Sequence, residues 1–165
     1  AVAQRASGFN MKVLYYDTFR QHEAEARLGV EFCPLEELLR ASDYVSLHVN
    51  LTTETRGLMD AQAFALMMPT AILINSARGP IVDPDALYVA LKEGQIAYAA
   101  LDVTDPEPLP ADHRLLGLPN LIVAPHIASA TVPSRNLMAM RAVENLLAGL
   151  RGEQLPYCAN PEVYG

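Results

Sequence analysis

Three kinds of side chain that can bind an anion or transfer a proton follow apolar runs of the sequence. Arg78 follows the run that ends at Ile74, Asp102 and Glu107 follow the run that ends at Leu101, and His126 follows Leu121 to Val123. A guanidinium can bind a carboxylate through two parallel hydrogen bonds. An imidazole can act as acid or base near neutral pH. These residue types predict acid–base chemistry on a substrate that carries a carboxylate.

Each of these segments also has a plain structural interpretation. Arg78 could be a surface arginine that pairs with a nearby acid. The segment LDVTDPEP, from Leu101 to Pro108, could be an acidic turn rich in proline, and His126 could be a structural histidine. The combination favours a site, because ligands of an open parallel sheet bind at the carboxyl ends of its strands.

Two further segments have residues suited to a nucleotide. Asp17 directly follows the run Val13 to Tyr16, where a carboxylate could accept hydrogen bonds from a ribose diol and favour NAD over NADP. A turn or helix-cap aspartate is the alternative. Hydroxyl and amide groups between Leu47 and Met59 could line a nucleotide, or this segment could be a capped loop before a short helix.

The elements that must position these residues alternate along the chain. Five apolar runs predict buried strands at Lys12–Tyr16, Tyr44–Leu47, Ala71–Ile74, Ile96–Leu101 and Leu121–Val123. Helices are predicted at the very start of the chain, at Leu35–Ala41, at Pro84–Glu93 with Asp83 as N-cap and Gly94 as terminator, and at Val132–Arg151 with Thr131 as N-cap. The residues from 152 on predict an extended tail. This order predicts an α/β fold, with a doubly wound parallel sheet covered by helices on both faces.

Composition narrows the class of protein. The chain has 165 residues, of which 51% are hydrophobic, which suits one domain. A formal net charge of -7 argues against a nucleic-acid partner. Cys33 and Cys158 have neither zinc-site spacing nor the density of a disulfide scaffold, so we expect no metal site and a reduced, cytoplasmic setting. No apolar run approaches the ~20 residues that cross a bilayer, so we expect no membrane partner.

Four segments, SLHVNLTTETRGLM, ILINSARGPIVDPDAL, AALDVTDPEP and LIVAPHIASAT, resemble in order and spacing the signature segments of the D-2-hydroxyacid dehydrogenases. The resemblance covers nearly the whole chain and implies a Rossmann-type NAD-binding domain. It implies hydride transfer between NAD(H) and a small 2-keto or 2-hydroxy acid such as glyoxylate or hydroxypyruvate. Arg78 would bind the substrate, His126 would exchange a proton with its oxygen, and Glu107 would hold and tune His126. The cofactor-binding residues that it implies are Asp17, Val49, Asn50, Thr55, Ser76, Ala77, Arg78, Asp102, His126, Ala128 and Ser129.

The sequence departs from the family pattern in two places. Asn50 stands where the family usually has proline, which removes a rigid turn. The family's first strand and its Gly-rich GxGxxG turn, which seat the pyrophosphate, should lie before Ala1. The resemblance thus implies a partial dinucleotide-binding domain over residues 1–151 and a tail over 152–165 that returns toward an absent substrate domain. Alone, such a fragment should bind NAD weakly and be inactive, whereas the full-length parent should be a homodimer.

Other members of the same superfamily are alternatives. Phosphoglycerate dehydrogenases are usually longer, and formate dehydrogenases have glutamine where Glu107 stands. A dinucleotide-sensing scaffold similar to the superfamily's corepressors would keep the arginine, glutamate and histidine. Turnover of a 2-keto acid distinguishes an enzyme from such a scaffold.

Overall fold

The computed structural model describes all residues from 1 to 165, which form two compact units, residues 1–125 and 126–165. The first unit begins with the helix α1 (Val2–Ala6) and a short 3-10 helix, η1 (Ser7–Phe9). A two-stranded parallel sheet follows, in which β1 (Leu14–Tyr15) pairs with β2 (Glu31–Phe32) and α2 (His22–Leu28) connects them. The predicted helical start is confirmed. The strand predicted at Lys12–Tyr16 covers only Leu14–Tyr15, is half-buried rather than buried, and lies in this separate small sheet, while β2 and α2 are additional.

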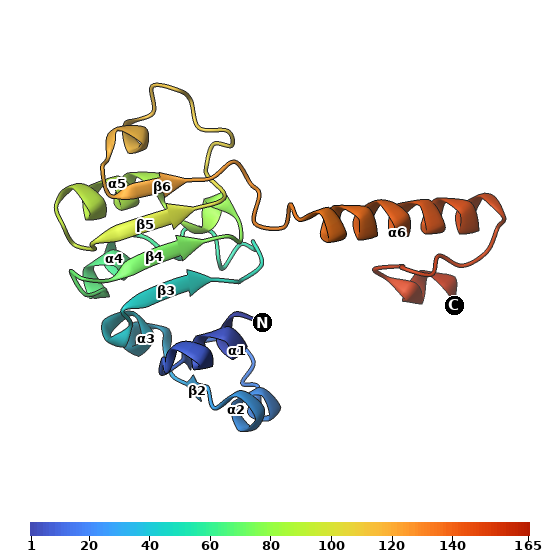
Figure 1. Cartoon of the computed structure of the whole chain (residues 1–165), viewed down its shortest axis with the longest axis horizontal. Helices are drawn as coiled ribbons and strands as arrows, with labels where there is room; N and C mark the ends of the chain where they lie inside the picture. Colours follow the sequence, from blue (N-terminus) through green and yellow to red (C-terminus); the bar gives the residue numbers. More distant parts are fainter. The chain divides into compact units, whose positions relative to one another are not determined.

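A four-stranded parallel sheet forms the larger part of the first unit (Figure 1). Its strands are β3 (Tyr44–Leu47), β4 (Ile72–Asn75), β5 (Tyr98–Leu101) and β6 (Leu121–Val123), in the order β3-β4-β5-β6. The elements between and before them are α3 (Leu35–Ala41), α4 (Ala61–Leu66), η2 (Gly79–Ile81), α5 (Pro84–Lys92) and η3 (Arg114–Gly117). Strand and helix alternate as the sequence predicts, so the α/β class with a parallel sheet is confirmed.

Local sequence signals explain where the helices begin. The Asp83 carboxylate caps α5 by accepting hydrogen bonds from the backbone N–H groups of Asp85 and Ala86. Gly94 follows the helix with φ of 70°, a left-handed conformation that glycine adopts at little cost. The predicted N-cap at Asp83 and the predicted terminator at Gly94 are therefore confirmed. Asp60 caps α4 in the same way, through the N–H of Ala63.

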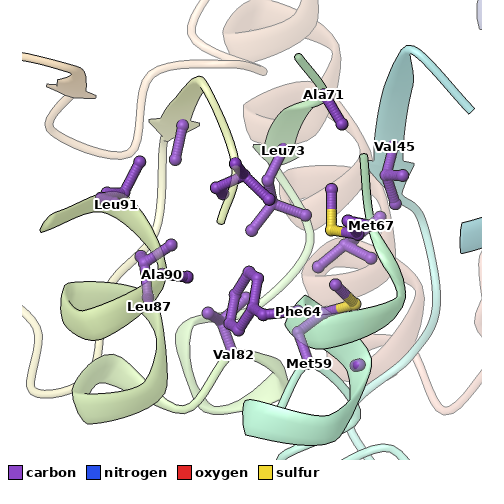
Figure 2. Packing of buried hydrophobic residues seen from close by; sticks show 14 of the residues in the cluster. Val45, Met59, Phe64, Met67, Ala71, Leu73, Val82, Leu87, Ala90 and Leu91 are labelled. Carbon is purple, nitrogen blue, oxygen red and sulfur yellow. The ribbon is translucent and has the colours of Figure 1, made fainter. Parts of the chain in front are cut away.

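The core lies between one face of the sheet and the helices α3, α4 and α5. Alternate strand residues point into it, and Phe64 of α4 lies fully buried among Met59, Val82 and Leu87 (Figure 2). On the opposite face of the sheet, Tyr44, Tyr98 and Ile122 are 54%, 54% and 69% exposed.

The second unit consists of the helix α6 (Val132–Leu150) and a tail. Thr131 caps α6 by accepting from the N–H of Ser134, as predicted. The tail contains a short 3-10 helix, η4 (Pro161–Tyr164), so the prediction of a purely extended tail is wrong. The Asn145 side chain binds both the N–H and the carbonyl of Tyr157, which folds the tail back along α6. None of the helices is both long and apolar enough to span a bilayer.

Candidate active site

The register of the four-stranded sheet places the ends of its strands in one row. Leu47 pairs with Asn75, Asn75 with Leu101, and Leu101 with Val123. The loops that carry the predicted chemistry all leave the sheet directly after this row. They begin with His48, Ser76, Asp102 and Ala124. Parallel strands with aligned carboxyl ends create the edge at which ligands of such folds bind.

The loop that carries Arg78 is held by the side chain of Asn75. Asn75 is fully buried, its Oδ1 accepts from the N–H of Ala77 at 3.0 Å, and its Nδ2 donates to the carbonyl of Arg78 at 2.9 Å. Its own carbonyl accepts from the N–H of Asp102 at 2.8 Å. One side chain therefore fixes the backbone on both sides of the Ala77–Arg78 peptide, while the guanidinium of Arg78 remains exposed.

The next loop lies directly against this one. A Cβ atom on Gly79 would come within 1.9 Å of the carbonyl oxygen of Thr104, so only glycine allows this approach. Thr104 is buried, its hydroxyl donates to the carbonyl of Pro106 at 2.8 Å, and its N–H donates to Oε2 of Glu107 at 3.4 Å. The close packing thus positions the loop that carries Asp102 and Glu107 beside the loop that carries Arg78.

A hollow of about 430 Å³ opens between the loops that follow β3 and β4. It is lined by His48, Val49, Asn50, Leu51, Ser76, Ala77 and Arg78. Thr55 is not among these lining residues. Its hydroxyl instead donates to the carbonyl of Asn50 at 2.6 Å and accepts from the N–H of Thr52 at 2.8 Å. Thr55 therefore shapes the wall of the hollow, and the loop closes with asparagine in place of the family's usual proline.

Asp17 lies at the carboxyl end of the smaller sheet, two residues after β1. It is exposed, and its Oδ1 accepts from the hydroxyl of Thr18 at 3.2 Å and from the N–H of Phe19 at 3.4 Å. The carboxylate thus stabilises its own turn, as the alternative interpretation predicts, and both of these hydrogen bonds use Oδ1. It belongs to a different sheet from the residues around the hollow.

Three predicted residues, His126, Ala128 and Ser129, lie at the start of the second unit. His126 has φ of 55°, a left-handed conformation that is uncommon for residues other than glycine. Such conformations concentrate at functional sites, where the surrounding structure maintains them. The expectation that His126 faces Arg78 and Glu107 stays a prediction.

Comparison with known proteins decides the family. Residues 1–128 match the family model described as the D-isomer specific 2-hydroxyacid dehydrogenase, NAD binding domain. The chain belongs to this family.

Curated relatives in the dehydrogenase family match along nearly the whole chain. A glyoxylate reductase of Korarchaeum cryptofilum is 53% identical over 163 residues, which are 99% of this chain and 49% of that protein. A glyoxylate/hydroxypyruvate reductase B of Citrobacter koseri is 49% identical over 166 residues, covering 100% of this chain and 51% of that protein. The chain therefore spans about half the length of these curated relatives.

Solved structures of the family agree with the fold. The crystal structure of D-lactate dehydrogenase with NAD⁺ from Lactobacillus jensenii matches with a TM-score of 0.86 and 34% identity, covering 96% of this chain and 51% of that one. The Rossmann-type, NAD-binding assignment of the dehydrogenase fold is thereby confirmed.

Two residues that organise these loops are not among those predicted from the sequence. Asn75 is a polar residue at an inward-facing strand position, and such a residue must bind buried backbone groups. Gly79 likewise stands where a loop needs a close backbone approach. An alternation analysis of residues 72–75 would have identified Asn75, because Leu73 and Asn75 point into the core together.

Proposed function

We propose that this chain is the nucleotide-binding part of an oxidoreductase that transfers a hydride between NAD(H) and a small 2-keto or 2-hydroxy acid. The observation that carries the proposal is the exposed guanidinium of Arg78, presented beside a hollow at the carboxyl edge of the sheet by a fully buried asparagine. Glyoxylate or hydroxypyruvate is the proposed substrate, because the similar curated proteins are reductases named for these acids.

The residues present fit a dinucleotide. The hollow offers apolar contact from Val49 and polar groups from Asn50 and Ser76, and Asp17 offers a free carboxylate oxygen for a ribose hydroxyl. A carboxylate at that position repels a 2′-phosphate, which favours NAD over NADP. The proposed cofactor-binding residues are Asp17, Val49, Asn50, Thr55, Ser76, Ala77, Arg78, Asp102, His126, Ala128 and Ser129, with Asp102 toward the nicotinamide carboxamide.

The mechanism assigns three tasks to side chains of this chain. When bound, the nicotinamide cofactor supplies or accepts the hydride. Arg78 binds the substrate carboxylate and polarises the carbonyl, which orients the acid and stabilises negative charge on its oxygen. In the reductive direction, the imidazolium of His126 donates its proton to that oxygen, so the 2-keto acid becomes a 2-hydroxy acid. In this proposal, Glu107 would hold the orientation of the His126 imidazole.

Turnover tests this proposal in the longest natural polypeptide that contains these residues. NADH oxidation with glyoxylate or hydroxypyruvate should be measurable, and His126→Ala should lower kcat by about 10²- to 10⁴-fold with little change in NADH affinity. His113→Ala is the matched control, because His113 caps η3 through the N–H of Leu115. A wild-type protein that binds NADH without turnover would favour a scaffold, and an unchanged kcat in His126→Ala would contradict its role.

A further inference from the structure

An arginine near the proposed ribose site is held by a carboxylate. Arg20, three residues after Asp17, donates from Nε to Oε1 of Glu25 at 2.8 Å and from Nη2 to Oε2 at 2.9 Å. This two-pronged pair is the strongest geometry that an arginine and a carboxylate can adopt. The pair uses the Nε and Nη2 edge of the guanidinium, and Nη1 takes no part in it, so the carboxylate holds the group in place and balances its charge.

Two tyrosine contacts fix the acceptor side of the pair. The hydroxyl of Tyr15 donates to Oε1 of Glu25 at 2.6 Å and accepts from the N–H of Gln21 at 2.8 Å. The side chain of Glu25 is only 17% exposed, whereas that of Arg20 is 52% exposed. The pKa of Glu25 is lowered to about 2, chiefly by the hydrogen bond from Arg20 and then by that from Tyr15. The carboxylate is thus anchored and ionised near neutral pH, while the arginine is the partner with room to move.

The guanidinium of Arg20 also contacts the face of an aromatic ring. Cζ of Arg20 lies 5.5 Å from the centre of the Phe32 ring, which also contacts Tyr15 edge-on. Cation–π attraction adds to the ion pair and keeps the guanidinium over the smaller sheet. The rest position of Arg20 is therefore determined by three elements, β1, α2 and β2.

In dinucleotide-binding domains, an acid after the second strand selects NAD, and an arginine nearby accommodates the 2′-phosphate of NADP. This chain has both residue types, with Asp17 as the acid and Arg20 as an arginine three residues later in the same segment between β1 and α2. We propose that Glu25 is a specificity-determining residue, which withholds Arg20 from a 2′-phosphate and so reinforces the selection of NAD by Asp17. This inference rests on the proposed ribose site at Asp17.

The repulsion by Asp17 and the pairing of Arg20 with Glu25 make separate predictions for substitutions. Asp17→Asn removes the repulsion but leaves Arg20 bound to Glu25, so affinity for a 2′-phosphate should rise little. Glu25→Gln keeps the shape of the side chain and removes its charge, which weakens the hold on Arg20. Only the double variant both removes the repulsion and frees the guanidinium, so the effects of the two substitutions should be strongly non-additive.

The test is an NMR titration of the 18.0 kDa chain, which detects binding in the millimolar range through backbone amide shifts and needs no turnover. The probes are 5′-AMP and 2′,5′-ADP, which differ in the 2′-phosphate. Their affinity ratio is measured for wild type, Asp17→Asn, Glu25→Gln and the double variant. The spectra also report whether each variant is folded, and the Arg20 Nε–H signal reports directly whether the pair has opened.

We expect the double variant to bind 2′,5′-ADP about tenfold or more tightly relative to Asp17→Asn, as one charge-assisted hydrogen bond to phosphate would give. Adding Arg20→Gln should abolish that gain. The inference is overturned if Asp17→Asn alone gives the full gain, if the double variant gives none, or if the gain survives Arg20→Gln. If 5′-AMP fails to shift the amides of residues 17–19 in wild type, the ribose site of the proposed function is itself contradicted and the inference falls with it.

Discussion

Replacing Asn75 by aspartate tests how the loop that carries Arg78 is held. Asn75→Asp keeps the volume and the oxygen that accepts from Ala77, but it loses the donor to the carbonyl of Arg78. The lost hydrogen bond costs about 1 kcal/mol, and placing a carboxylate at a fully buried position beside a carbonyl oxygen adds a similar or larger penalty. We expect the variant to lose about 2–4 kcal/mol of unfolding free energy near neutral pH.

The pH dependence identifies the cause of this loss. Burial raises the pKa of the new carboxyl above its unfolded value, and the protonated form can donate to the carbonyl of Arg78. The folded variant then binds the extra proton more tightly than the unfolded chain, so its deficit should shrink between about pH 7 and about pH 5. Urea denaturation followed by circular dichroism measures both values in the chain itself.

A matched substitution separates the loop from general stability. Asn120 also donates through Nδ2 to two backbone carbonyls, those of Leu91 and Ala97, at the opposite end of the sheet. Asn120→Asp should destabilise the chain without shifting the amide signals of residues 76–78, whereas Asn75→Asp should shift them. The reasoning is refuted if Asn75→Asp remains within about 0.5 kcal/mol of wild type, or if its deficit does not depend on pH.

Substitutions at Glu25, Asp83 and Gly79 test individual contacts. The pKa of Glu25 lies below its ordinary value of 4.5, at about 2, so the pairing of its carboxylate stabilises the fold above pH 4.5 and is lost as the pH falls toward 2. In an acid titration followed by circular dichroism, Glu25→Gln should remove the loss of stability that occurs between these pH values. Asp83→Ala should cost about 1 kcal/mol in urea denaturation, and an unchanged midpoint would contradict its capping role. Gly79→Ala should cost about 3 kcal/mol or more because of the Thr104 carbonyl, whereas Gly117→Ala, with open space around it, should be close to neutral; equal costs would disprove the close approach.

Long apolar segments with clear end signals were predictable. The helix α5 was located from Asp83, Pro84 and Gly94, since each acts on the backbone beside it, and β3 and β6 were located residue by residue. The strand β2 is not predictable from its own residues, because it has only two of them and is defined by its pairing with β1, which lies earlier in the sequence. The helices α2 and α4 are short and have few buried residues, so their periodicity is weak.

The site was predictable at the level of loops rather than of contacts. Position after an apolar run correctly placed Arg78 and Asp102 at one edge, because parallel strands align their carboxyl ends. The sequence could not give the packing of Gly79 on Thr104, which depends on two loops meeting in space. It also could not distinguish Thr55 as a support of the loop from Thr55 as part of the lining of the hollow, since both need the same hydroxyl.

The row formed by Leu47, Asn75, Leu101 and Val123 also divides the chain by its tolerance of mutation. Leu47, Asn75 and Leu101 are almost completely buried, whereas His48 and Ser76, one residue later, are exposed. Substitutions within the row must preserve volume and hydrogen bonding, whereas substitutions of the exposed residues directly after it, such as His48 and Ser76, should cost little folding free energy. The surface at this edge can therefore be varied at those exposed positions, for example in a library, while the buried residues of the row and of the loop packing at Gly79 and Thr104 are kept.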